Sequence, residues 1–208
     1  MRVLGISGSL RRGSYNTTLL HAAAELLEAE GADVEIYEHL KEVPAYDEDD
    51  DGDSVPAAAA RIRAAVAAAD AVFFSTLEYN RSVPGQLKNA VDWLSRPKGA
   101  CALRNKPVAV VGASTGIFGA VWAQAELRKV LGAAGARVIE GELPVSHAQT
   151  RFDEAGRLGD PELEDQLREI VRTLVAEAAP GKDVPPRAAR NREPITGDTR
   201  TASTAGVA

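Results

Sequence analysis

The chain has a single cysteine, Cys101, so it can form neither an intrachain disulfide nor a metal site built from several thiolates. Positive charge is also scarce, because 24 lysines and arginines face 30 acidic residues and leave a net charge of −6. Nucleic acids and acidic membranes bind basic surfaces, so neither is expected as a partner. No apolar run is long enough to cross a membrane, and the apolar start, residues 1–7, is too short for a signal peptide. We therefore expect a cytoplasmic protein.

Metal-binding side chains are too scattered to suggest a metal site. His21 and His39 have no ligand spacing to a partner. The acidic run 47–52 matches the first half of a calcium-binding EF-hand loop, but Ala58 stands where the bidentate glutamate belongs. We therefore expect a solvated acidic loop and no metal. Cys101 has no histidine near it in the sequence, so we expect a bystander rather than a nucleophile.

Short apolar runs alternate with segments of helical periodicity through most of the chain. The expected strands are residues 3–6, 33–37, 71–75, 108–112 and 137–139. The expected helices are residues 16–30, 55–69, 86–94, 118–131 and 161–177, the second capped by Ser54 and the last by Asp160. Parallel strands need crossover connections, so this alternation predicts an α/β fold with a doubly wound sheet of five parallel strands and helices on both faces. Ligands of such folds bind outside the carboxyl ends of the strands.

The composition of the chain changes near residue 180. Residues 1–180 contain the periodic pattern and are expected to form one domain. Residues 181–208 are rich in proline, arginine and threonine and show no periodicity, so we expect a flexible tail. An ordered arm that reaches across a neighbouring subunit is the alternative.

The loop between the first expected strand and helix, residues 7–17, is rich in serine and glycine and contains Arg11 and Arg12. The following helix presents free N–H groups and the positive end of its dipole, and nearby hydroxyls and a guanidinium would suit a phosphate monoester. Neither a Walker A motif nor the dinucleotide-binding glycine fingerprint occurs, so a terminal phosphate fits better than a pyrophosphate. The alternative is a solvated loop that only caps the helix.

The loop after the third expected strand, residues 76–85, places Glu78, Tyr79 and Asn80 side by side. A carboxylate, an aromatic ring and an amide can border a flat heterocycle that has alternating donors and acceptors, and backbone N–H groups there could bind the carbonyls of a flavin. The alternative is a polar loop on which Tyr79 packs as a lid.

The loop after the fourth expected strand, residues 112–119, consists mainly of small residues that let backbone N–H groups approach a planar ligand. It also matches the G-x-S-x-G nucleophile elbow of α/β-hydrolases, with Ser114 as the nucleophile. Acidic residues and then His147 follow in the order that a hydrolase triad requires. The acidic candidates are Glu126, Glu140 and Glu142. A hydrolase does not explain the other two loops, so this interpretation ranks below a ligand-binding loop.

Together these loops resemble the NADPH-dependent FMN reductase family, which includes azo-, quinone- and chromate-reducing members. The resemblance runs from Met1 to about Ala178 and is carried by residues 7–11, 14, 16, 78–80, 82, 84–85, 87–90 and 92–93. It implies a flavodoxin-like fold, with strand order 2-1-3-4-5, that binds FMN non-covalently. One departure is Leu77, because the family usually has proline there, whose fixed φ would stiffen the loop.

The resemblance also implies which residues hold the cofactor. The phosphate would be bound by Ser9, Arg11, Ser14, Asn16 and Thr17. The isoalloxazine ring would be flanked by Leu77, Glu78, Tyr79 and Asn80, and the predicted site is completed by Ser82, Ser114, Thr115 and Gly116. No catalytic acid or base is expected, because FMN carries the chemistry.

The expected activity is that of an NAD(P)H-dependent reductase. NADPH or NADH would reduce the bound FMN, and the electrons would pass to a quinone, an azo compound, a free flavin or a metal oxyanion. The resemblance further implies a homodimer or homotetramer. One alternative is a flavodoxin-type electron carrier that does not oxidise NAD(P)H directly. The others are a serine hydrolase that uses Ser114 and a phosphate-binding module without flavin.

Overall fold

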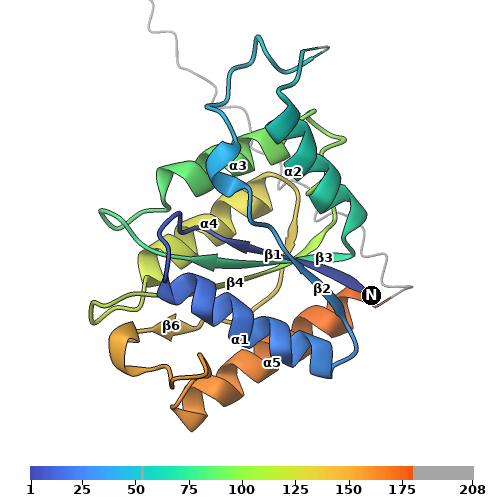
Figure 1. Ribbon diagram of the computed structural model, residues 1–208. Helices are drawn as coiled ribbons and strands as arrows, with labels where there is room; N and C mark the ends of the chain where they lie inside the picture. The colour runs from blue at the N-terminus through green and yellow to red at the C-terminus, as the bar shows by residue number, and fades with distance from the viewer. Residues whose placement is uncertain (53, 180–208) are drawn as a thin grey trace, which may run out of the picture.

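A parallel sheet forms the centre of the molecule (Figure 1). The computed structural model describes residues 1–52 and 54–179, and the predicted tail, residues 181–208, lies outside the described residues. The strands are β1 (Arg2–Ser7), β2 (Asp33–Ile36), β3 (Ala71–Thr76), β4 (Pro107–Ala113), β5 (Arg137–Val138) and β6 (Pro144–Val145). They lie in the order β2-β1-β3-β4-β5, with β6 also paired to β4, and every pairing is parallel. The predicted strand order 2-1-3-4-5 is confirmed.

Helices cover both faces of the sheet. They are α1 (Tyr15–Ala29), α2 (Ala57–Ala68), α3 (Gly85–Leu94), α4 (Val121–Ala133) and α5 (Pro161–Ala178). Figure 1 shows α2, α3 and α4 on one side of the sheet and α1 and α5 on the other. Phe73 and Phe74 of β3 are fully buried and pack in the cores on opposite faces, because successive side chains alternate along a strand.

The strand expected at residues 137–139 is present as β5, and a further short strand, β6, follows it in the chain. β5 pairs with the start of β4, whereas β6 pairs with its end, at Gly112 and Ala113. Between them, the guanidinium of Arg128 on α4 donates to the carbonyls of Ile139 and Gly141, at 2.7 Å each. These carbonyls are therefore bound by a side chain of a helix. The strand predicted at residues 137–139 is confirmed to within one residue, whereas no strand was expected at β6.

The helix starts follow local backbone rules. Asp160 caps α5 as predicted, since its carboxylate accepts the N–H groups of residues 162 and 163. Ser54 is not the cap of α2, which begins after Pro56 without a side-chain cap. Proline disfavours helical backbone in the residue before it, so the chain stays extended up to that point. α4 begins later than predicted, because Gly119 and Ala120 have left-handed φ values of 57° and 62°.

The acidic loop 47–52 is anchored rather than wholly solvated. Its Asp51 pairs with Arg63 of α2 at 2.7 Å, and the two side chains are only 13% and 16% exposed. The expectation of a solvated loop is therefore wrong at this residue. Cys101 is buried, and its thiol donates to the carbonyl of Ala134. No helix in the described part of the chain is long and apolar enough to span a bilayer.

Candidate functional site

Three loops meet at the carboxyl ends of β1, β3 and β4 and border two cavities that share residues. The first, of about 150 Å³, is lined by Ser9, Arg11, Ser14, Tyr15, Asn16, Leu77, Glu78, Tyr79, Ala113, Ser114 and Thr115. The second, of about 210 Å³, is lined by Gly8, Leu10, Arg11, Leu77, Tyr79, Pro84, Gly85 and Gln86. The three loops that the sequence predicts as ligand-binding therefore lie together, at the end of the sheet where doubly wound folds bind their ligands.

The cavities and the predicted residues overlap but are not identical. Four predicted residues line neither cavity: Thr17, Asn80, Ser82 and Gly116. Tyr15 and Ala113 line the first cavity although the predicted site does not include them. Their positions, at the first turn of the helix after the phosphate loop and at the end of a buried strand, were the only sequence signals for them.

The loop from β1 to α1 presents donors at the start of a helix. Ser14 is the N-cap of α1, and its hydroxyl oxygen accepts the N–H of Asn16 at 3.2 Å. The Ser9 hydroxyl oxygen accepts the N–H of Arg11 at 3.3 Å, and the guanidinium of Arg11 lies 5.8 Å from the centroid of the Tyr15 ring. No acidic residue occupies the first turn of α1, so the positive end of the helix dipole is not neutralised from within the helix. This donor set suits a phosphate.

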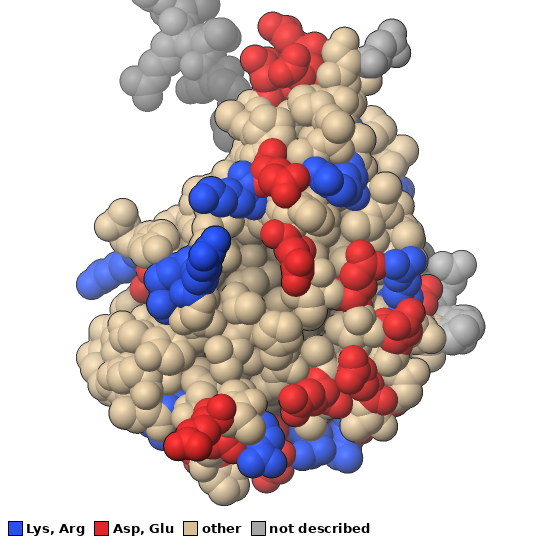
Figure 2. All heavy atoms as spheres, in the orientation of Figure 1, with Lys and Arg blue, Asp and Glu red and all other residues tan. Residues whose placement is uncertain are grey.

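This loop is also a basic area on an acidic protein. Arg11 and Arg12 are both exposed, although the chain as a whole has a net charge of −6. In Figure 2, blue side chains gather at the left over the loop between β1 and α1, whereas red side chains dominate the top and the lower right. A dianionic ligand would therefore be attracted to this end of the sheet rather than to the surface in general.

Two of the predicted phosphate ligands, Asn16 and Thr17, have side chains that bind residues of the strands. The side chain of Asn16 is 3% exposed as a residue and binds both backbone groups of Ala113, donating to the carbonyl at 2.8 Å and accepting the N–H at 2.9 Å. Its oxygen also accepts the hydroxyl of Ser75 at 3.2 Å. The hydroxyl of Thr17 lies 3.0 Å from that of Ser7. Asn16 therefore joins the start of α1 to the ends of β3 and β4.

The loop after β3 contains a tight turn with strained backbone. Tyr79 and Ser82 exchange two backbone hydrogen bonds, of 3.2 and 3.0 Å. The residues between them, Asn80 and Arg81, have φ values of 53° and 59°, the pattern of a two-residue hairpin turn with two left-handed residues. Leu77, Glu78 and Tyr79 line the first cavity, and Tyr79 is 61% exposed at its edge.

The loop after β4 does not assemble a hydrolase triad. The Ser114 hydroxyl oxygen accepts the N–H of Gly116 at 3.1 Å. In the described residues, no hydrogen bond joins this hydroxyl to the ring of His147. Glu126, one of the acids considered for a triad, accepts the hydroxyl of Ser82 instead. Ser114 and Thr115 line the first cavity, so the loop has the position of a ligand-binding wall.

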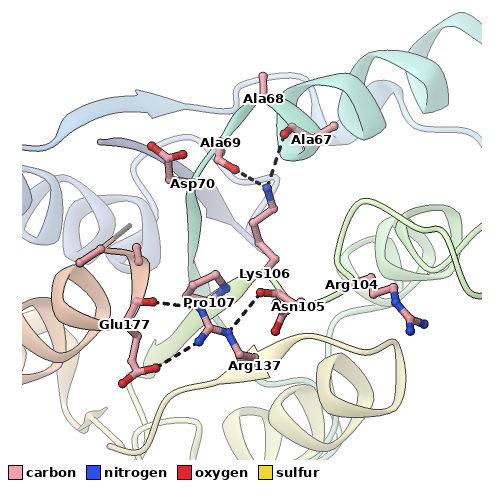
Figure 3. Close-up of a pocket in the computed structure, with 12 residues that line it drawn as sticks. Ala67, Ala68, Ala69, Asp70, Arg104, Asn105, Lys106, Pro107, Arg137 and Glu177 are labelled. Atoms are coloured by element: carbon pink, nitrogen blue, oxygen red, sulfur yellow. Dashed lines mark hydrogen bonds and ion pairs between the residues drawn. The ribbon is translucent and has the colours of Figure 1, made fainter. Parts of the chain in front are cut away.

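A larger cavity, of about 470 Å³, lies at the amino ends of the strands, away from these loops (Figure 3). Lys106 points across it and donates to the carbonyls of Ala67 and Ala69 at the end of α2. Burial lowers the pKa of Lys106. Arg137 donates to the backbone and the carboxylate of Glu177 at the end of α5. Both cations thus satisfy helix C-termini, which is a structural role.

Known proteins are similar to this chain in sequence. The family model of the NADPH-dependent FMN reductase matches residues 1–150. The chain is 42% identical over 173 residues to the NAD(P)H-dependent FMN reductase of Pseudomonas aeruginosa. This match covers 83% of this chain and 90% of that relative. It is 34% identical over 176 residues to a 2-hydroxy-1,4-benzoquinone reductase of Burkholderia sp, which covers 84% and 92%.

Solved structures show the same relationship. The flavoenzyme NAD(P)H:(acceptor) oxidoreductase FerB of Paracoccus denitrificans matches with a TM-score of 0.73 and 31% identity over 85% of this chain and 98% of that chain. A flavodoxin of Pseudomonas aeruginosa matches with a TM-score of 0.54 and 19% identity over 84% and 99%, which shows the fold alone. The predicted family and fold are confirmed, and the chain belongs to the NADPH-dependent FMN reductase family.

Proposed function

We propose that this chain binds FMN at the three loops and acts as an NAD(P)H-dependent reductase of a small acceptor, which is a quinone, an azo compound, a free flavin or a metal oxyanion. The observation that carries the proposal is the juxtaposition of a helix start that suits a phosphate with a cavity lined by two further loops. The bound FMN would supply the redox chemistry, accepting a hydride from the nicotinamide and passing the electrons on to the acceptor. Family membership and the named activities of the relatives support this function.

The chain's own residues would bind and orient the cofactor. Ser9, Arg11 and Ser14 would hold the phosphate at the start of α1. Backbone groups of residues 77–79 and 114–115 would border the ring, where donors close to the heterocycle set its electronics. Asn16 would act behind them by fixing the loops. No side chain of the site is assigned as a catalytic acid or base.

A homodimer or homotetramer is part of this proposal. The exposed large hydrophobic side chains Leu10, Tyr79, Ile117 and Phe118 belong to the three loops around the site. Exposed apolar side chains grouped in this way are typical of protein interfaces. We expect sedimentation velocity to give the mass of a dimer or tetramer, and a monomer at micromolar concentration would contradict this part of the proposal. The scarcity of cysteine supports a cytoplasmic location.

The experiment that tests the function is an absorption spectrum of the purified protein before and after anaerobic addition of NADPH. A flavin spectrum that bleaches would support both the cofactor and the reductive step. A flavin spectrum that persists after NADPH and then NADH would favour a flavodoxin-type electron carrier. A colourless protein that does not take up FMN on reconstitution would overturn the proposal.

Replacing Arg11 by alanine is expected to raise the dissociation constant for FMN by about 10- to 100-fold, because a hydrogen bond to a charged group contributes roughly 1.5–3 kcal/mol. Fluorescence titration of the apoprotein with FMN measures the change. Arg12→Ala is the matched control, since Arg12 is exposed in the same loop but lines neither cavity. Equal affinities of the Arg11→Ala variant and the wild type would refute the phosphate role.

Replacing Ser114 by alanine is expected to leave most of the NAD(P)H-dependent quinone reduction, within about threefold of the wild-type rate, because the FMN rather than this hydroxyl carries the chemistry. Steady-state NAD(P)H consumption with a quinone measures it. Hydrolysis of p-nitrophenyl acetate by the wild type serves as the control. Complete loss of reduction in the variant, together with esterase activity of the wild type, would restore the hydrolase alternative.

A further inference from the structure

Two carboxylates join the loop after β3 to helix α4, one from Glu78 in the loop and one from Glu126 in the helix. One oxygen of Glu78 accepts the N–H groups of Trp122 and Ala123, both at 3.1 Å. These groups belong to the first turn of α4, and Ala120, which precedes the helix, provides no side-chain cap. The carboxylate of Glu78 therefore caps the start of α4, which the N-cap residue Ala120 cannot do, although Glu78 lies 44 residues away from Trp122 in the chain.

The second carboxylate belongs to the helix and binds the loop. Glu126 lies on the second turn of α4 and accepts the hydroxyl of Ser82 at 2.6 Å and the N–H of Val83 at 3.2 Å. The hydrogen bond from Ser82, followed by that from Val83, lowers the pKa of Glu126. The carboxylate is therefore ionised at neutral pH and available to both donors. Glu78 and Glu126 together fasten residues 78–83 to the helix.

This loop needs such contacts to keep its shape. Asn80 and Arg81 both have left-handed backbone, a conformation that the Cβ of arginine disfavours. The guanidinium of Arg81 lies 4.9 Å from the centroid of the Trp122 ring, which adds a third contact to α4. Leu77 stands where the NADPH-dependent FMN reductase family usually has proline, so the φ of residue 77 is not fixed by a proline ring at the start of the loop.

We propose that Glu126 is a positioning residue for FMN, because its bonds to Ser82 and Val83 hold the loop after β3, residues 77–84, against α4. We call this loop the ring-facing loop. This inference rests on the FMN site proposed above. α4 directly follows the loop after β4, which forms another wall of the first cavity. The contacts therefore fix the two walls relative to each other. Glu126 lines neither cavity, so its replacement acts on the cofactor only through the loop.

The test compares Glu126→Ala, Glu126→Gln, Ser82→Ala and the double variant Ser82→Ala/Glu126→Ala by titrating each apoprotein with FMN. Glu126→Ala is expected to raise the dissociation constant about tenfold, since it leaves the Val83 N–H without its acceptor. Glu126→Gln is expected to recover most of the affinity, because its amide oxygen still accepts. The double variant is expected to bind no more weakly than Glu126→Ala, because both changes remove the same contact.

Glu169→Gln on α5, an exposed glutamate on the opposite face of the sheet, is the matched control, and urea unfolding of every apoprotein separates stability from affinity. Unchanged affinity in Glu126→Ala, with a wild type that binds FMN, would overturn this inference alone. So would equal losses in Glu126→Ala and Glu126→Gln, or additive losses in the double variant. A wild type that binds no FMN would overturn the proposed function as well.

Discussion

Replacement of Asn16 by alanine is expected to lower the free energy of unfolding by about 3 kcal/mol or more, because each buried polar group left without a partner costs roughly 1–3 kcal/mol. The change would leave three such groups, namely the N–H and carbonyl of Ala113 and the hydroxyl of Ser75. Urea unfolding of the apoprotein, followed by fluorescence or circular dichroism, measures the loss.

The same variant is expected to bind FMN at least about tenfold more weakly, since the ends of β3 and β4 would no longer be held against the start of α1. Asn89→Ala is the matched control. Asn89 also binds backbone on two sides, the Pro44 carbonyl and the Tyr46 N–H, at 2.7 Å each, but it lines neither cavity. The control should lose stability and keep its affinity for FMN. An Asn16→Ala protein with the stability and affinity of the control would show that Asn16 does not organise the site.

Asn16 illustrates which part of the site the sequence could give. Its place in a loop of hydroxyls and arginines, after a buried strand, predicts a polar residue near a phosphate, and the residue does line the cavity. Its partner Ala113 is 97 residues away, and no local pattern connects the two. Ser82 is a second case, because its hydroxyl donates to Glu126, 44 residues away. The order of the strands places a residue near the ligand, whereas the direction of its side chain depends on the hydrogen-bond partners that other elements of the fold provide.

The same distinction holds for the fold. The alternation of strands and helices, and the cap at Asp160, depend on periodicity and on neighbours within a few residues, so they could be predicted. The short strand β6 could not, because it has only two residues and depends on pairing with Gly112 and Ala113 of β4, which lie about 30 residues earlier in the chain. The late start of α4 is a similar case, since the turn at Gly119 is fitted to the backbone of a strand that comes after it.

Gly119→Ala is the second change with a large expected effect, a loss of about 3 kcal/mol in the free energy of unfolding. An added Cβ would lie 2.4 Å from the carbonyl carbon and 2.5 Å from the oxygen of Pro144 in β6. These are backbone atoms paired to β4, so they cannot move aside as a flexible side chain would. The φ of 57° adds roughly 1–2 kcal/mol of strain for a residue with a Cβ.

Gly116→Ala is the matched control in the same loop, because its added Cβ would meet only the Ser114 hydroxyl, at 3.5 Å. Urea unfolding should show a change of less than about 1 kcal/mol for this control, and similar losses in both variants would refute the steric argument. The left-handed turn at Gly119 also places the start of α4 beside the loop after β3. Ala120 does not cap this helix with its side chain, and Glu78 of the loop accepts the N–H groups of its first turn instead. A Gly119→Ala protein that still folds should therefore bind FMN more weakly, and unchanged affinity would show that the start of α4 and the ring-facing loop are independent of each other.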